Sequence, residues 1–405
     1  MDRKVGINRY LIAILCIFVT DAVVLPIGPE IKTIGMSLIC LFAWLKYILC
    51  PKCRVNYTTK NHLVILLYIP IITILLSQLV NLDFSLGYEY KIFLLLGGFA
   101  MASMVKFSDL MDAFVNVMLV VAICSVAVWA FTFMGVDYWS GLPQTGENEY
   151  YTLGITVVHT SRGLWYRNFG PFWEPGVYHI YLNFCIAYLL LFKNKTPLNK
   201  LLFFIVALIT TFSTTGYACF LLIMVSYFIK KLTTLNIKIL ISIVALIAGM
   251  VLILTNEYIN AIVLGKIVES NTSFDVRMMD SKLYFEMFLQ DPIFGIGLTD
   301  AYNRVQKLYE HLGINYSGAS STTFREFASM GLYLGMIRLL LQWKFAKRFL
   351  NNGMLPAILF FAVILIMLNT EDLCFSLFLN MIFYYAILKV KNNETENLNV
   401  SYSKL

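Results

Sequence analysis

Charged side chains are scarce in this chain: only 14% of its 405 residues are Asp, Glu, Lys or Arg. A soluble protein carries about 25% charged and about 45–50% apolar residues, whereas 59% of this chain is hydrophobic. A soluble fold has too little interior to bury that much apolar surface, so lipid must cover it. The composition therefore predicts an all-α, polytopic integral membrane protein.

Several recognisable functional motifs are also missing. The sequence has no Walker loop, no dinucleotide fingerprint and no Gly-x-Ser-x-Gly elbow, and its four histidines lack metal-ligand spacing. Cys50-Pro-Lys-Cys53 has the spacing of half a zinc or redox site, but no second pair exists and no disulfide framework is implied. The basic residues are scattered singly, which argues against a nucleic-acid partner. We expect no cofactor and no metal.

Apolar runs long enough for spanning helices recur along the chain. A span needs roughly 20 apolar residues, and the candidates are residues 10–27, 31–50, 62–80, 91–105, 111–134, 175–192, 200–213, 217–229, 238–255, 323–343, 354–369 and 373–389. The run at 91–105 is short. The stretch at 200–229 is too long for one span, and we interpret it as a tight helical hairpin in which Gly216 eases the turn.

Lysine and arginine positions orient these spans. With a cytoplasmic N-terminus, every inner connection carries at least one of the 31 basic residues. The short outer turns carry almost none: Ser213-Thr-Thr-Gly216 is uncharged and Asn369-Thr-Glu-Asp372 is acidic. Because basic residues favour the cytoplasmic side, the pattern predicts about twelve spans with both termini, including a tail at 390–405, in the cytoplasm.

Two long connections, 135–174 and 256–322, then fall on the outer face of one membrane domain covering 1–405. They hold most of the remaining basic residues, against the usual topological preference. This suggests an anionic ligand on the outer face, with ordinary loop solubility as the alternative. The two loops are placed asymmetrically and no inverted repeat is visible, which argues against the internal symmetry of secondary transporters.

The first loop ends in a dense polar and aromatic segment, from Arg162 to Gly176. Glu174 lies where the chain enters the membrane, as either a helix-capping acid or an active-site carboxylate able to orient or deprotonate a hydroxyl. Arg162 and Arg167 are suited to gripping phosphate through a planar fork of donors. The aromatic residues form an interfacial belt or flat apolar faces for sugar rings.

The second loop contains an amphipathic segment from Arg277 to Gln290, which predicts a helix lying on the outer membrane face. Asp291-Pro292 ends it, and Phe294-Gly-Ile-Gly297 makes a flexible turn.

A third polar segment, Ser320 to Gly335, opens the tenth span. Arg325 and Glu326 lie near its outer end, where a charge marks a functional site or simply lies at headgroup depth. Asp21, in the first span, is a further intramembrane charge that either pairs with a basic group or lines a cavity.

These motifs, in this order, resemble those of the O-antigen polymerases, relatives of the O-antigen ligases of bacterial inner membranes. The motifs that carry the resemblance are Arg167-Asn-Phe-Gly-Pro-Phe-Trp-Glu-Pro-Gly176, then Arg277 through Asp-Pro-Ile-Phe-Gly-Ile-Gly297, then the Ser320–Gly335 run. Thr210 to Gly216 also looks like the family's small-residue turn between two spans. The resemblance covers roughly residues 100–390.

The resemblance implies a membrane glycosyltransferase of the bacterial inner membrane. Such polymerases join oligosaccharide repeat units held on undecaprenyl pyrophosphate at the periplasmic face, in lipopolysaccharide or related polysaccharide biosynthesis. A chain-length regulator protein is a further expected partner. Motif matching assigns catalytic roles to Arg167, Glu174 and Arg277, and placement alone assigns substrate binding to Arg162, Arg325, Trp165 and Trp173.

One departure from the resemblance favours polymerase over ligase. Ligases of this superfamily usually have a histidine before the tenth span, near where this chain has Ser320-Ser321, and His311 lies too far upstream. A ligase of finished polysaccharide and a twelve-span transporter or flippase of lipid-linked oligosaccharide stay as alternatives.

Overall fold

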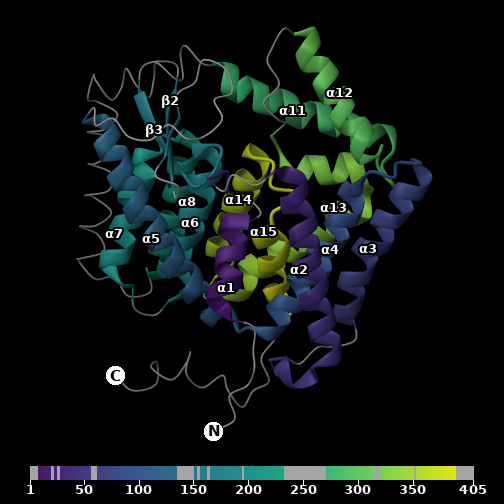
Figure 1. Ribbon diagram of the computed structural model, residues 1–405, viewed down its shortest axis with the longest axis horizontal. Helices are drawn as coiled ribbons and strands as arrows, with labels where there is room; N and C mark the ends of the chain where they lie inside the picture. The colour runs from purple at the N-terminus through teal and green to yellow at the C-terminus, as the bar shows by residue number, and fades with distance from the viewer. Residues whose placement is uncertain are drawn as a thin grey trace.

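The computed structural model describes residues 8–19, 22–24, 28–55, 62–134, 150–152, 156–161, 165–193, 196–231, 271–312, 320–350 and 353–388. Most of these residues form helices packed in one bundle (Figure 1). The first half of the bundle contains α1 (Arg9–Ile14), prolonged by a π-helical turn, α2 (Pro29–Leu49), α3 (His62–Val80), α4 (Leu86–Met104) and α5 (Phe107–Phe133). The second half contains α6 (Pro175–Ala187), prolonged by a π-helical turn at Tyr188–Phe192, α7 (Leu198–Thr210), α8 (Thr214–Lys231), α13 (Thr322–Phe349), α14 (Met354–Thr370) and α15 (Leu377–Ile382).

Most of the bundle helices coincide with predicted apolar runs, but the runs at 10–27 and 373–389 are only partly helical in the described residues, through α1 with its π-helical turn to Val19 and through α15 with a 3-10 turn at Phe383–Ala386. The run at 238–255 lies outside the described residues. The hairpin expected at 200–229 is present as α7 and α8, and the short run at 91–105 is the end of the longer helix α4. Three described helical stretches are long and apolar enough to cross a membrane: Pro29–Leu49, Phe107–Thr132 and Pro175–Phe192. The chain is therefore a membrane protein, while twelve crossings with both termini inside stay a prediction.

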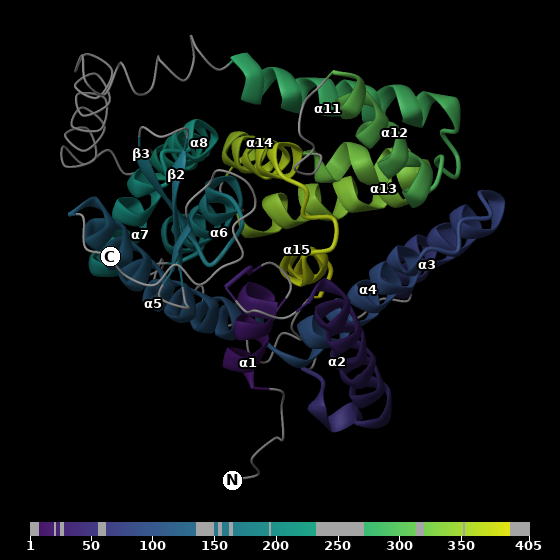
Figure 2. The same cartoon turned by 45° about the horizontal axis from the view of Figure 1, so that its top comes forward.

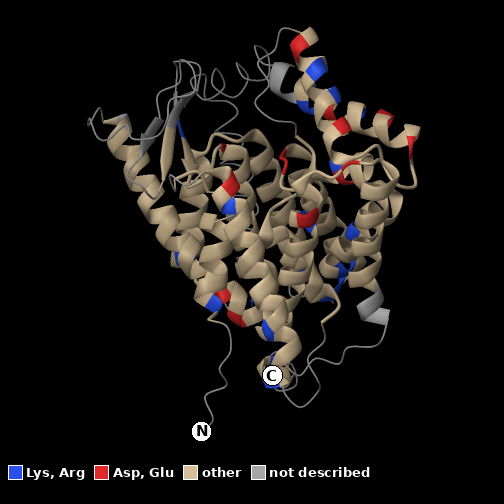
Figure 3. Cartoon of the chain, turned by 45° about the vertical axis from the view of Figure 1, so that its right-hand side comes forward, with Lys and Arg blue, Asp and Glu red and all other residues tan. Residues whose placement is uncertain are grey.

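Charge is distributed unevenly over the bundle. Figure 3 shows that most helices carry few charged residues, whereas the helix at the upper right, α12 (Leu298–His311), carries several of both signs. Apolar side chains of α2, among them Ile31, Leu38 and Phe42, are exposed as lipid-facing residues would be. Cys50 and Cys53, after α2, are joined by a disulfide that sequence reasoning did not anticipate.

The first long loop contains a small antiparallel sheet, so the all-α prediction was incomplete. Its strands β1 (Tyr150–Thr152), β2 (Val157–Ser161) and β3 (Trp165–Gly170) lie in sequence order. Val157, opposite Gly170 in the register, is buried with Phe169 in a minor apolar cluster. Strands this short carry too few alternating residues to be recognised by period, although β-branched residues favour them.

The second long loop contains α11 (Asn271–Gln290) and α12, which pack on α13. A helix is present where the sequence predicted one and ends just before Asp291-Pro292, while its place on the outer membrane face stays a prediction. Tyr284 and Met287 of α11 are buried in a second apolar core with residues of α12 and α13, while Met278 and Leu289 are exposed.

A kink in α13 fixes the far end of α11. Gly331 has a φ of 83°, which favours glycine, and a Cβ there would overlap the backbone carbonyl of Ile293. The amide of Leu332 donates to the Pro292 carbonyl at 2.8 Å. The turn after α11 is therefore bonded to the bundle, and this anchors the helix that carries Arg277.

Both views place the sheet and α11 at the same end of the bundle (Figures 1 and 2). Strand β3 packs against α5 and α6, and α11 contacts α13 and the end of α14. Arg167 of the first long loop and Arg277 of the second are therefore carried at one end of the molecule.

Candidate active site

Arg167 is held rigidly beside the turn between α7 and α8. From strand β3, its Nε donates to the Thr211 carbonyl at 3.1 Å and its Nη2 to the Phe212 carbonyl at 3.4 Å. Burial lowers the pKa of Arg167 to about 10, although the nearby Glu174 acts in the opposite direction. The guanidinium stays charged at neutral pH, oriented by two main-chain oxygens.

Glu174 stands at the N-cap position of α6, and Pro175 is the first helical residue, as expected. Its side chain makes no capping hydrogen bond, so the carboxylate does not act as a capping acid. It is near enough to influence both Arg167 and Glu371 electrostatically. The catalytic role of Glu174 stays a prediction.

Arg277 of α11 reaches the same place from the second loop. Its Nη2 lies 2.8 Å from the Oε1 of Glu371, which directly follows α14. The Glu371 side chain is 6% exposed and the Arg277 side chain 26% exposed. Arg277 also acts electrostatically on Arg167. The two arginines therefore belong to one cluster although they come from different loops.

Glu371 and Glu174 form a carboxyl pair at the centre of this cluster. Burial and the adjacent Glu174 raise the pKa of Glu371 well above its ordinary value, and Arg277 and Arg167 oppose this shift without cancelling it. The raised pKa brings Glu371 towards the range in which a carboxyl group can both take up and release a proton. The cluster thus combines two fixed cations with a pair of groups able to exchange a proton, which suits phosphate binding and acid–base chemistry.

The main chain of Glu371 is anchored by the start of α13. The Thr322 amide and hydroxyl both donate to the Glu371 carbonyl, at 3.2 and 2.7 Å, and the Thr322 hydroxyl accepts from the Leu373 amide at 2.7 Å. Just before it, Ser320 donates through its amide and hydroxyl to the buried Asp280, at 2.8 Å each. The segment Ser320–Thr322 therefore fixes the position of the Glu371 main chain.

The residues predicted to bind substrate are less closely gathered. Arg325 forms an ion pair with Asp372 and lies over the ring of Phe375, 5.4 Å from its centroid. It therefore contacts Asp372, the neighbour of Glu371 in the sequence. Trp173 is 37% exposed, next to Glu174. Arg162 lies outside the described residues, as does the side chain of Trp165, whose backbone belongs to β3.

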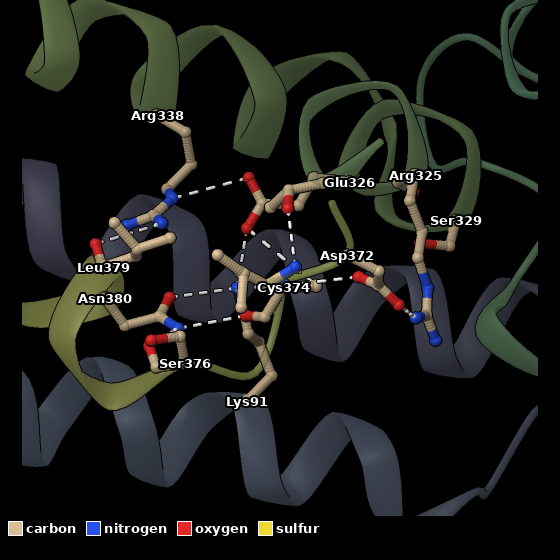
Figure 4. A network of polar contacts seen from close by, with 12 residues as sticks. Lys91, Arg325, Glu326, Ser329, Arg338, Asp372, Cys374, Ser376, Leu379 and Asn380 are labelled. Carbon is tan, nitrogen blue, oxygen red and sulfur yellow. Dashed lines mark hydrogen bonds and ion pairs between the residues drawn. The ribbon is translucent and has the colours of Figure 1, made fainter. Parts of the chain in front are cut away.

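Glu326 belongs to a buried ionic network below the site, shown in Figure 4. Lys91 of α4 donates to the Glu326 carboxylate at 2.6 Å, and the Nε of Arg338 lies 3.4 Å from its other oxygen. Lys91 also donates to the Cys374 carbonyl at 2.6 Å and to Asn380 at 2.9 Å. This network ties α4, α13 and α15 together and braces the turn that carries Glu371.

Sequence reasoning missed two residues of the cluster. In the sequence, Glu371 was interpreted only as part of an acidic outer turn. Its position at the end of a span, on the same side as two arginine-bearing loops, was the signal that could have identified it. His179 of α6 is fully buried, and neither of its ring nitrogens has a hydrogen-bond partner among the described residues. Arg277 and Arg167 both act on its ring electrostatically. No sequence signal separates it from an ordinary core histidine.

Gly176, in the first turn of α6, lets Glu371 approach the helix. A Cβ at this position would overlap the Glu371 carboxylate. We expect Gly176→Ala to displace that carboxylate and to destabilise the protein by about 1–3 kcal/mol, the usual cost of overpacking. Thermal unfolding in detergent would measure this. Gly35→Ala is the control, because a Cβ there meets no atom within 4 Å, and equal melting temperatures for both variants would contradict the prediction.

Among the described residues, no group of three or more His, Cys, Asp and Glu side chains is arranged to hold a metal ion. The cluster instead offers cations, a carboxyl pair and a buried imidazole.

Part of the chain is similar to a known protein family. No curated protein matches the chain. Residues 201–337, from α7 through much of α13, match the model of a family described as O-antigen ligase. The matched segment contains Arg277 and the anchoring segment Ser320–Thr322. This match supports membership of the chain in the O-antigen polymerase/ligase superfamily.

Proposed function

We propose that this protein is a polymerase of undecaprenyl-pyrophosphate-linked oligosaccharide repeat units. It would transfer the growing glycan from its lipid carrier to the next lipid-linked unit, at the outer face of a bacterial inner membrane. The observation that carries the proposal is the meeting of Arg167, Glu174 and Arg277, from two separate loops, around Glu371. This cluster matches the chemistry that such a transfer requires.

The transfer needs charge stabilisation and removal of one proton. A hydroxyl of the acceptor sugar attacks the anomeric carbon of the donor, and the bond from that carbon to the pyrophosphate oxygen breaks. The electron pair leaves with the lipid pyrophosphate, whose growing negative charge Arg167 and Arg277 would stabilise. The hydroxyl proton passes to the carboxyl pair of Glu174 and Glu371. No nucleotide or cofactor takes part in this scheme, because the sugar–pyrophosphate bond supplies the energy.

A ligase is the second candidate, since the family match does not separate the two activities. The polymerase is favoured by the segment before α13, where ligases usually have a histidine. Here that place is Ser320-Ser321, and Ser320 is bonded to Asp280. The family match gives no support to a transporter.

Analysis of lipid-linked and surface glycan from a deletion strain tests the function. Loss of a polymerase leaves single repeat units on undecaprenyl pyrophosphate and on the cell surface. Accumulation of long polymer on the lipid carrier would identify a ligase instead, and repeats trapped on the cytoplasmic side would identify a flippase. Purified protein that lengthens glycan in detergent would exclude pure transport, because detergent micelles have no second compartment.

A further inference from the structure

The first turn of α6 and Arg277 together form a place suited to an anion. The first amide groups of a helix have no acceptor within it, and the positive end of the helix dipole favours negative charge. α6 starts at Pro175, and the missing Cβ of Gly176 leaves its backbone open to close approach. Arg277 faces the same place and Arg167 lies close by. This arrangement is a phosphate-binding geometry.

An acid of the chain itself fills this place. The Glu371 carboxylate lies against Gly176 and bonds to Arg277 at 2.8 Å. His179 follows Gly176 by three residues on α6, and its side chain packs against Gly216 of α8. Both ring nitrogens of this buried histidine lack partners among the described residues. Arg277 and Arg167 both act electrostatically on this buried ring, and its unpaired nitrogens leave hydrogen-bonding capacity near the place that Glu371 fills.

We propose that Glu371 occupies the position of the donor pyrophosphate, and that the arriving pyrophosphate displaces it and thereby makes it the base for the acceptor hydroxyl. This inference rests on the proposed function and adds an order of events to it. The acid pairs with Arg277 before the donor binds and meets the acceptor afterwards.

Because the main chain of Glu371 is anchored, this displacement requires only a rotation of its side chain. Its carbonyl accepts two hydrogen bonds from Thr322, and Leu373 is bonded to the same threonine. The main chain can therefore stay fixed while the side chain rotates away from Arg277. Released from that guanidinium, the carboxylate is a stronger base, because a neighbouring cation favours the ionised form. Rotation of the side chain alone keeps the displaced carboxylate near Glu174.

The acceptor oxygen forms a bond to the anomeric carbon, and its proton moves to the Glu371 carboxylate. The bond from the anomeric carbon to the pyrophosphate oxygen breaks, and its electron pair stays on the pyrophosphate. Departure of the lipid pyrophosphate returns Arg277 to Glu371, and that renewed pairing favours release of the proton to solvent.

Binding of inorganic pyrophosphate to purified full-length protein, measured by calorimetry in detergent near neutral pH, tests this competition. We expect Glu371→Ala to bind pyrophosphate about tenfold more tightly than the wild type, the effect of one hydrogen bond to a charged group, and to lose glycan transfer. Glu174→Ala removes a carboxyl group from the same pair but leaves Glu371 on Arg277. We therefore expect its affinity for pyrophosphate to rise less than that of Glu371→Ala, because Glu371 still competes for Arg277.

Each outcome is decisive. Equal tightening in both variants would reveal a general charge effect and overturn the proposal, as would unchanged or weaker binding in Glu371→Ala. If Glu371→Ala does not fold, Glu371→Gln replaces it, with tightening in the same direction required. Glu286→Gln, an exposed acid on α11 beside Lys282, controls for loss of any carboxylate. Pyrophosphate binding does not require sugar, so the glycan pattern of the deletion strain reports on the proposed function separately.

Discussion

Replacing Arg277 by Gln is expected to slow glycan transfer by about 100- to 1000-fold, the usual effect of losing one donor that stabilises a developing anion. Arg277 contacts Glu371 directly and is the contribution of the second long loop to the cluster. Cells that make this variant should therefore display single repeats in place of long chains. Gel analysis of surface glycan, with immunoblotting of the membrane fraction, measures the effect.

The matched control for Arg277 is Lys282→Gln on the same helix. The Lys282 side chain is 79% exposed and lies 3.9 Å from Glu286 in a surface pair, which contributes little to stability. It should leave the glycan ladder unchanged. Normal long chains in the Arg277 variant, at normal protein level, would remove Arg277 from the site.

Replacing Glu326 by Gln is expected to destabilise the protein by about 3–5 kcal/mol, since it leaves buried charges without their partner. Glu326, Lys91 and Arg338 are at most 3% exposed at their side chains. The variant keeps two buried cations and loses the single carboxylate between them. Thermal unfolding in detergent and the amount of protein in membranes both measure the loss.

Lys91→Met tests the asymmetry of this network. It removes one cation and leaves Glu326 paired with Arg338, so we expect a smaller destabilisation than in the Glu326 variant. A larger loss in Lys91→Met would show that the contacts of Lys91 with Cys374 and Asn380 dominate over charge balance. Glu286→Gln serves here as the exposed control.

Local chemistry explains why many elements could be predicted from the sequence. Pro175 marks the start of α6 because its fixed φ suits a first helical position and its missing amide costs nothing there. Asp291-Pro292 ends α11 because proline cannot continue a helix. The apolar stretch at 200–229 is divided into two helices as expected, but the turn lies at 211–213 and Gly216 lies inside α8. Each of these predictions depended on residues within one turn of the boundary.

Long-range pairing explains what the sequence did not reveal. Glu371 belongs to the site only because the end of α14 meets the start of α6 and because Arg277 reaches it from α11. Lys91 lies in what read as a weak apolar run, and only its pairing with Glu326 and Arg338 shows why a lysine is tolerated there. Arg167, Glu174 and Arg277 were selected through motif resemblance, and their nearness is a finding of the structure.

Helix α6, which carries part of the site, is covered almost entirely by other parts of the protein. In Pro175–Phe192, 94% of an 18-residue stretch is buried within the protein, against 17% for Pro29–Leu49. Membranes of different thickness act on helices that face lipid, through tilt and local thinning. A change in membrane thickness should therefore tilt α2 and its neighbours, whereas Glu174, Gly176 and His179 should keep their spacing. We therefore expect the site geometry to be the same in thick and thin bilayers.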